Sequence, residues 1–171
     1  MNYLVITLTA LVPLFVGFIW YNNAFGFGKI WMAETGLSEE KMRSDFNPLK
    51  LFGTVYLLGI MMALAMTPMV IHQFGFRSLL AGVAGINDSE TEAGRVYAYV
   101  MENFAGQYRS FGHGALHGCM TAILLVLPVL AINALFERKS WKYIFIHLGF
   151  WVITLSLMGA ILCRYFQFSV S

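Results

Sequence analysis

Charged side chains are scarce in this sequence. Of its 171 residues only 12% are Asp, Glu, Lys or Arg, while 58% are hydrophobic, which is far more apolar than a soluble domain of this size requires. The formal net charge is only +2, and the basic residues form no cluster that could follow a phosphate backbone. We therefore expect no nucleic-acid partner. The composition favours a single integral membrane domain over residues 1–171 with the lipid bilayer as its main partner.

Recognisable catalytic motifs are also missing. The sequence contains no glycine-rich phosphate loop, no Gly-x-Ser-x-Gly and no His-Glu-x-x-His, and no nucleophile is paired by spacing with a base. No Asp, Glu, Lys or Arg lies deep in an apolar stretch, where ion pumps and proton relays usually keep such residues. These absences weigh against an ion-coupled transporter and an intramembrane enzyme, and we predict no catalytic residue.

Sulfur-containing residues give no clear site. Cys119 and Cys163 both fall in apolar stretches without the spacing of a metal knot or redox pair, so we interpret them as small packing residues. The ten methionines occur in both apolar stretches and connections. We interpret them as packing residues and not as a copper-binding run.

Four apolar stretches are each long enough to cross a bilayer, since about 20 residues span the hydrocarbon core. The first has no basic segment before it and no small-residue cleavage site after it, so we expect it to remain attached. The link between the last two is so short that these spans should run antiparallel. The predicted fold is all-α, a four-transmembrane-helix up-and-down bundle. Its spans cover residues 3–21, 51–71, 111–136 and 142–163.

Each predicted span has small residues along one face. They recur about every four residues, so they lie on one side of the helix and allow a neighbouring helix to approach closely. We expect this packing to hold the bundle together. The small residues are Thr9, Pro13 and Gly17; Gly59, Ala63 and Thr67; Gly114, Gly118 and Ala122; and Gly149, Ser156, Ala160 and Cys163.

The connections contain their own helix signals. Ser38 should cap a short helix in the first connection, and Asn47 with Pro48 should start the second span. In the second connection, Ser89 with Glu92 matches a capping box. Apolar residues then recur at helical spacing, which predicts an extra amphipathic surface helix over residues 90–108, lying on the membrane or packed against the bundle.

Basic residues are distributed unequally between the two predicted ends. The first and third connections carry seven of the eleven, and the termini with the second connection carry four. The positive-inside bias therefore places the first and third connections in the cytoplasm and both termini outside. The seven are Lys29, Lys41, Arg43, Lys50, Arg138, Lys139 and Lys142.

Histidines supply the sharpest local feature. His113 and His117 are four residues apart on the third span, so they share one face. His72, at the exit of the second span, should lie at the same depth, and three imidazoles could complete a zinc- or copper-type site. The alternative is that they are interfacial residues bonded to loops. Nothing in the sequence places Glu102 or Asp88 close enough to add a carboxylate.

His147 is predicted near the opposite end of the fourth span. Because it lies at the other end of the predicted bundle, it should be too far from the other histidines to join them. We expect it to make a hydrogen bond between helices.

Three groups of segments carry a resemblance to known proteins. They are Trp20-Tyr21 with Phe27-Gly28-Lys29-Ile30-Trp31-Met32 and Gly36-Leu37-Ser38-Glu39-Glu40; Asn133-Ala134-Leu135-Phe136-Glu137 with Ser140; and Gly149-Phe150-Trp151 with Met158-Gly159-Ala160-Ile161. They resemble a family of small bacterial four-helix membrane proteins that is itself a domain of unknown function. The resemblance implies a helical bundle in a bacterial inner membrane and supplies no activity. His113 and His117 lie outside these segments.

Two hypotheses of function remain. The first is a non-catalytic membrane protein that works by association, with itself or as an accessory subunit of a membrane complex, and it rests on the small-residue faces. The second is a membrane protein that handles a metal ion or small ligand through His72, His113 and His117 on the outer side.

Overall fold

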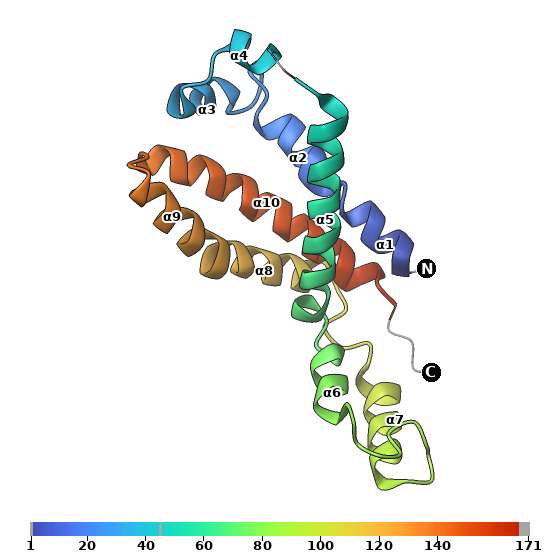
Figure 1. Cartoon of the computed structure of the whole chain (residues 1–171). Coiled ribbons are helices and arrows are strands. Elements are labelled where there is room, and N and C mark those ends of the chain that lie inside the picture. Colours follow the sequence, from blue (N-terminus) through green and yellow to red (C-terminus); the bar gives the residue numbers. More distant parts are fainter. Residues whose placement is uncertain (1, 45, 168–171) are drawn as a thin grey trace.

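The computed structural model describes residues 2–44 and 46–167, and every regular element among them is a helix (Figure 1). Four helical stretches in this part of the chain are long and apolar enough to cross a membrane, which confirms the four predicted spans. They are Asn2–Trp20, Pro48–Val70, Phe111–Phe136 and Trp141–Tyr165.

The first span consists of two helices, α1 (Asn2–Thr9) and α2 (Val12–Trp20). Pro13 explains the break, because it has no N–H to donate to the carbonyl four residues earlier and its ring crowds that carbonyl. The helix is therefore interrupted at residues 10–11.

The second span is α5 (Pro48–Val70). The Asn47 side chain accepts a hydrogen bond from the Lys50 N–H at 2.9 Å, and Pro48 occupies the first turn, as predicted. The helix thus begins three residues before the predicted apolar stretch.

The third span changes its winding partway along. It begins as α8 (Phe111–Thr121), widens into a π-helical segment η1 (Ala122–Val126) and continues as α9 (Leu127–Phe136). Pro128 lies just beyond the π-helical segment and cannot donate to an earlier carbonyl, so the wider winding accommodates it. The fourth span, α10 (Trp141–Tyr165), runs without interruption.

The closest contacts between helices occur at glycines. This agrees with the close packing that we predicted at the small-residue faces. A Cβ on Gly114 would lie 2.2 Å from the Gly159 carbonyl oxygen, and one on Gly118 would lie 2.0 Å from that of Leu155. Here α8 packs along α10, the most extensive helix pair in the described chain. A Cβ on Gly59 of α5 would lie 2.5 Å from the Ala10 carbonyl oxygen, at the break in the first span.

Not every span follows its neighbour for its whole length. Figure 1 shows α9 and α10 leaving α5 at an angle, so the described helices are splayed at one end. The core contains Val70, Ile71, Met158, Leu162 and Cys163, where α5 and α10 approach each other. The histidines lie beside this closed part of the bundle.

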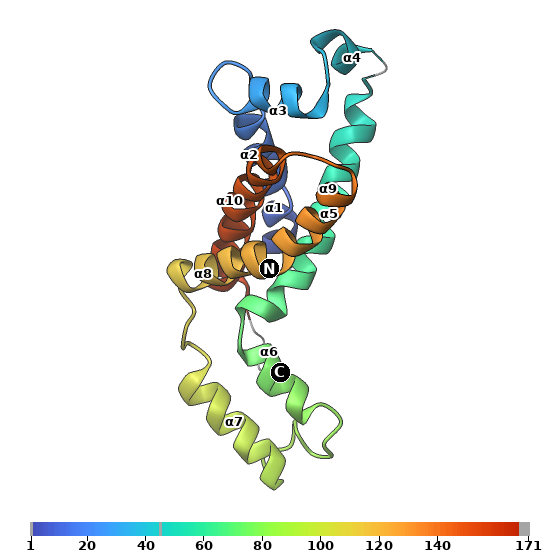
Figure 2. The ribbon, with the colours of Figure 1, turned by 90° about the vertical axis from the view of Figure 1, so that its left-hand side faces the viewer.

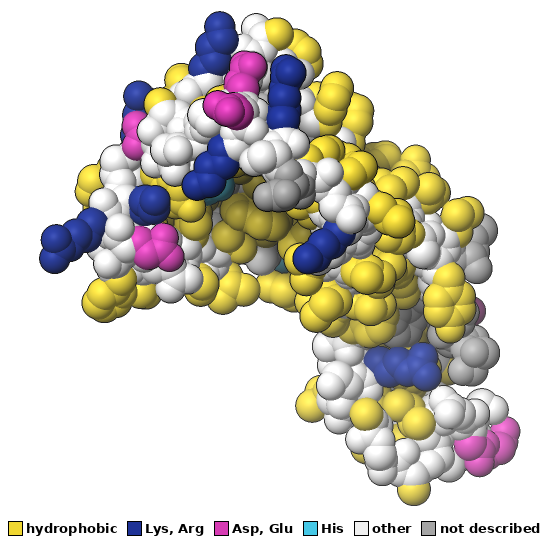
Figure 3. Space-filling view, turned by 45° about the horizontal axis from the view of Figure 1, so that its top comes forward, with side chains coloured by type: hydrophobic (Ala, Val, Ile, Leu, Met, Phe, Trp, Pro, Cys, Tyr) yellow, Lys and Arg dark blue, Asp and Glu magenta, His cyan; other side chains and the backbone are white. Residues whose placement is uncertain are grey.

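The first and last residues that the structure describes, Asn2 and Gln167, lie beside each other at one end of the spans (Figure 1). The Asn2 side chain donates to the Gln167 carbonyl at 2.6 Å and accepts from the Gln167 N–H at 2.7 Å. The opposite end holds α3 (Gly28–Thr35) and α4 (Glu39–Arg43), the latter capped by Ser38 as predicted. Figure 3 shows Lys and Arg side chains gathered there and hydrophobic side chains covering the spans.

The second connection forms a helical hairpin that extends from the end of the spans (Figure 2). Its helices are α6 (Gln73–Leu80), which the sequence analysis did not predict, and α7 (Glu92–Phe104). They pack on each other, with the rings of Phe76 and Tyr97 stacked at 6.0 Å. The amphipathic helix is thus paired with α6 and is shorter than residues 90–108.

The start of α7 differs from the predicted capping box. Thr91, not Ser89, is the N-cap, and its hydroxyl accepts the Gly94 N–H at 3.0 Å. The Asp88 carboxylate accepts the Glu90 N–H at 2.9 Å, which forms a turn through Ser89 and moves the helix start two residues on.

Candidate metal centre

Local structure places two histidines on one face of α8. The Ser110 hydroxyl accepts the His113 N–H at 3.2 Å, so the helix starts at Phe111 and His113 falls in its first turn. His117 follows one turn later. Gly114 and Gly118 face α10, and each histidine precedes one of these glycines by one residue, or about 100° around the helix. The imidazoles therefore lie beside the α10 contact.

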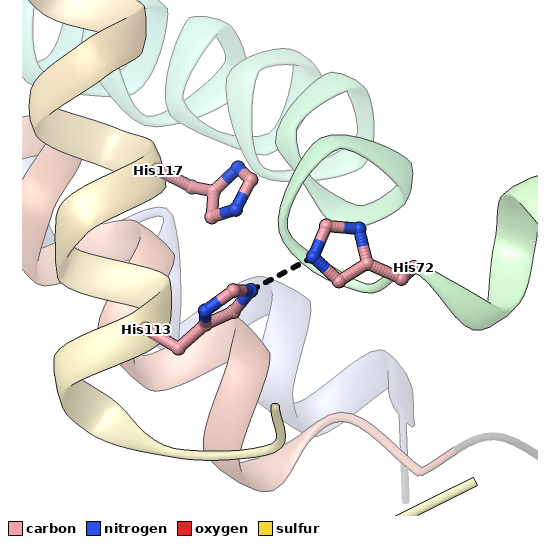
Figure 4. A group of neighbouring side chains, drawn as sticks. All are labelled: His72, His113 and His117. Atoms are coloured by element: carbon pink, nitrogen blue, oxygen red, sulfur yellow. Dashed lines mark hydrogen bonds between the residues drawn. The ribbon is translucent and has the colours of Figure 1, made fainter. Parts of the chain in front are cut away.

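The third histidine comes from a different part of the chain. His72 lies between α5 and α6 and serves as the N-cap of α6. Its imidazole meets the other two, as Figure 4 shows. Sequence position alone put the three at a similar depth, and the structure brings all three side chains together.

The three imidazoles form a compact cluster. Nε2 of His72 and Nε2 of His113 lie 2.9 Å apart, at hydrogen-bond distance. The ring centroids are 4.9 Å apart for His72 and His113, 5.1 Å for His72 and His117, and 4.5 Å for His113 and His117. One candidate ligand nitrogen from each ring lies within 4.8 Å of the others.

These separations fit a single metal ion. Three nitrogens around a tetrahedral Zn²⁺ at about 2.0–2.1 Å would be about 3.3 Å from one another. His72 and His113 would move apart by a few tenths of an ångström, and His117 would move inward. Such shifts lie within the reach of side-chain rotation, so the residues present suit a zinc- or copper-type ion.

The cluster is open to its surroundings. His72 is exposed, and His113 and His117 are half-buried, so an ion could enter from outside the bundle. Three protein ligands leave a fourth position free. The group of ligands found among the described residues contains neither Glu102 nor Asp88, so neither carboxylate joins the cluster.

Tyr108 forms an aromatic wall that the sequence analysis did not identify. Its ring centroid lies 5.1 Å from that of His113 and 5.7 Å from that of His72. Its backbone is left-handed, with φ 60°, an uncommon conformation for a residue other than glycine. Its carbonyl oxygen accepts from the Cys163 thiol at 3.2 Å. A link between α7 and α8 is thereby held against both the histidines and α10.

Two further contacts hold the base of the hairpin. The Gln73 side chain donates to the carbonyl oxygens of Ala105 at 2.7 Å and Gln107 at 3.3 Å. Arg109 donates to the Phe166 carbonyl at the end of α10, and burial lowers the pKa of its guanidinium. Neither role has a local sequence signal, because both depend on segments far apart in the chain.

The remaining predicted residues lie elsewhere. Nδ1 of His147 and the Tyr21 hydroxyl form a hydrogen bond of 3.0 Å. This bond joins α10 to the end of α2, which confirms the predicted bond between helices. Burial, with a smaller contribution from Tyr143, raises the pKa of the Tyr21 phenol. Cys163 is buried and Cys119 half-buried, and neither belongs to the ligand group.

The structure thus defines a class of protein: an all-helical protein with four helical stretches long and apolar enough to span a membrane and three histidines gathered at one end. A family model described as a protein of unknown function (DUF1761) matches residues 4–163, and the chain belongs to this family. The match includes all three histidines. Neither a curated protein nor a solved structure shows significant similarity to the chain.

Proposed function

We propose that this protein binds a transition metal ion through His72, His113 and His117. The observation that carries the proposal is the meeting of three imidazoles from two elements, with one nitrogen of each within 4.8 Å of the others. Imidazole nitrogens are ligands that Zn²⁺ and copper ions share.

Hydrogen bonding alone accounts less well for the cluster. A neutral imidazole has one N–H donor and one acceptor nitrogen, so the bond between His72 and His113 uses a single donor. A third ring beside this pair adds a nitrogen that the bond does not need. A metal ion accepts lone pairs from all three rings at once, which favours metal binding over a purely structural role.

The open fourth position and the exposure of His72 favour an exchangeable ion. We therefore infer that the protein acquires and releases a metal at the membrane surface. The surplus of basic residues at the opposite end supports an orientation with the histidines and both termini outside, in a multi-pass protein of a bacterial inner membrane.

Association was the other hypothesis, and it rested on small residues. The closest approaches of Gly59, Gly114 and Gly118 are to other helices of the same chain. Internal packing thus accounts for these faces. A homo-oligomer or a membrane complex would have to use other surfaces, so metal binding has the more specific support.

Metal titration of the purified protein in mild detergent tests the proposal. We expect one Zn²⁺ or Cu²⁺ per chain, measured by calorimetry and elemental analysis. His72→Ala, His113→Ala and His117→Ala should each lower affinity at least about 100-fold, because loss of even an outer-shell partner costs about 10- to 100-fold.

The fourth histidine of the chain supplies the control. His147→Ala should keep wild-type stoichiometry and affinity, because His147 bonds to Tyr21. A wild-type protein that binds none of Zn²⁺, Cu²⁺, Ni²⁺ or Co²⁺, or equal losses in His147→Ala and His113→Ala, would contradict the proposal.

A further inference from the structure

An apolar groove lies between α5 and the third span, where these helices diverge. It encloses about 460 Å³ and has no charged residue in its lining. Its α5 wall contains Met62, Met66 and Met69. Its other wall comes from η1 and the neighbouring parts of α8 and α9, including Thr121 and Asn133. The groove therefore presents three thioethers within the membrane-spanning part of the molecule.

The methionines are concentrated just before His72. Of the ten in the chain, four lie within nine residues, at positions 61, 62, 66 and 69. Met62, Met66 and Met69 follow one another by four and three residues, so they share the face of α5 that lines the groove. The sequence analysis interpreted the methionines as packing residues and did not predict that three of them line one wall.

Both walls of the groove lead to the histidine cluster. On α5, Met69 precedes His72 by three residues. On α8, Thr121 follows His117 by four residues and donates to its carbonyl oxygen at 2.8 Å. One end of the groove therefore lies beside the proposed metal centre.

The methionines can act in pairs. Side chains three or four residues apart on a helix have Cβ atoms about 5–6 Å apart, which flexible thioethers can bridge through one ion. Met66 is 3% exposed and Met69 42% exposed. Met66 belongs to both possible pairs. Met66 with Met69 is the pair nearer the histidines, and Met66 with Met62 is the pair deeper in the span.

Ligand softness selects the ion. Thioethers favour Cu(I), whereas imidazoles bind zinc and copper alike, so copper is the metal that suits both sets of ligands. The cost of moving an ion into an apolar medium rises with the square of its charge, so a monovalent ion enters such a groove far more easily than a divalent one. The lining offers no carboxylate that would favour a hard divalent ion.

We propose that the groove is a copper(I) site built on Met62, Met66 and Met69, which receives its ion from the histidine cluster. The receiving step rests on the proposed function, but binding by the thioethers does not. No change of oxidation state is involved, because the ion enters and stays as Cu(I).

The test is anaerobic competition for Cu(I) against a chromogenic chelator, together with X-ray absorption at the copper edge, on purified full-length protein. Wild type should bind Cu(I) with both nitrogen and sulfur scattering. Met66→Leu, which nearly conserves volume, should lower the affinity of the sulfur site at least about tenfold, as should Met62→Leu with Met69→Leu. Met61→Leu is the matched control and should change nothing, because Met61 does not line this groove.

The two proposals fail separately. Sulfur scattering absent from wild type, or Cu(I) affinity unchanged in Met66→Leu, would overturn the copper(I) groove, whatever the histidines bind. Sulfur scattering that persists in a His113→Ala, His117→Ala double variant supports the thioether site. Zn²⁺ binding retained in that double variant would instead overturn the histidine centre.

Discussion

The Nε2 atoms of His72 and His113 lie 2.9 Å apart although 41 residues separate them in the chain. His72 begins the α6–α7 hairpin, and His113 lies just beyond it. The contact therefore closes the base of the hairpin, where Gln73 also bonds to the carbonyl of Ala105. An ion at this site would join the two ends of an element that extends from the membrane spans.

Metal binding should consequently stabilise the hairpin. We expect Zn²⁺ to slow amide hydrogen exchange in α6 and α7, because joining their ends opposes local opening. Exchange in the middle of α10 should not change. In His113→Ala the same addition of Zn²⁺ should leave hairpin exchange as it was, and protection that persists in this variant would contradict the link.

Acidification should weaken metal binding. A protonated imidazole has no lone pair to give, so protons compete with the ion for each ring nitrogen. The affinity for Zn²⁺, measured by calorimetry, should fall as the pH is lowered from about 7.5 to about 5.5, because histidine changes charge in this range. The bound metal should return on neutralisation, and affinity independent of pH over this range would exclude imidazole ligands.

Gly114→Ala should destabilise the protein and weaken metal binding together. The new Cβ would lie 2.2 Å from the Gly159 carbonyl, so α8 must move away from α10 and carry His113 with it. Overpacking of this kind costs about 1–3 kcal/mol, which thermal unfolding in detergent can measure. Gly112→Ala is the control, since its added Cβ would meet no atom of another helix within 4 Å. Equal stability of the two variants would contradict the packing account.

Tyr21→Phe should affect stability but not metal binding. It removes the 3.0 Å hydrogen bond to His147, and such bonds contribute about 0.5–1.5 kcal/mol. Because this contact lies at the end opposite the histidine cluster, Zn²⁺ affinity should stay within about twofold of wild type. A large loss of Zn²⁺ affinity in this variant would show that the two ends are coupled.

The resemblance noted in the sequence analysis led to the correct family but not to the site. Its segments lie at the two ends of the chain, whereas His72, His113 and His117 lie between them. Periodicity placed His113 and His117 on one face because helical spacing is local. Periodicity could not identify Tyr108 as a residue of the site, because its position there depends on a left-handed backbone and on contacts with two histidines.

Local sequence alone was enough to predict the four spans and the caps that start α4 and α5. Long uncharged segments must satisfy their backbone groups internally in lipid, and hydroxyl or amide caps act on amides a few residues away. Three features could be seen only in the folded chain: α6 pairs with α7, His72 meets His113, and three methionines line one groove. These depend on where whole helices approach or diverge, which is set by packing at contacts such as Gly114 with Gly159 and not by local spacing.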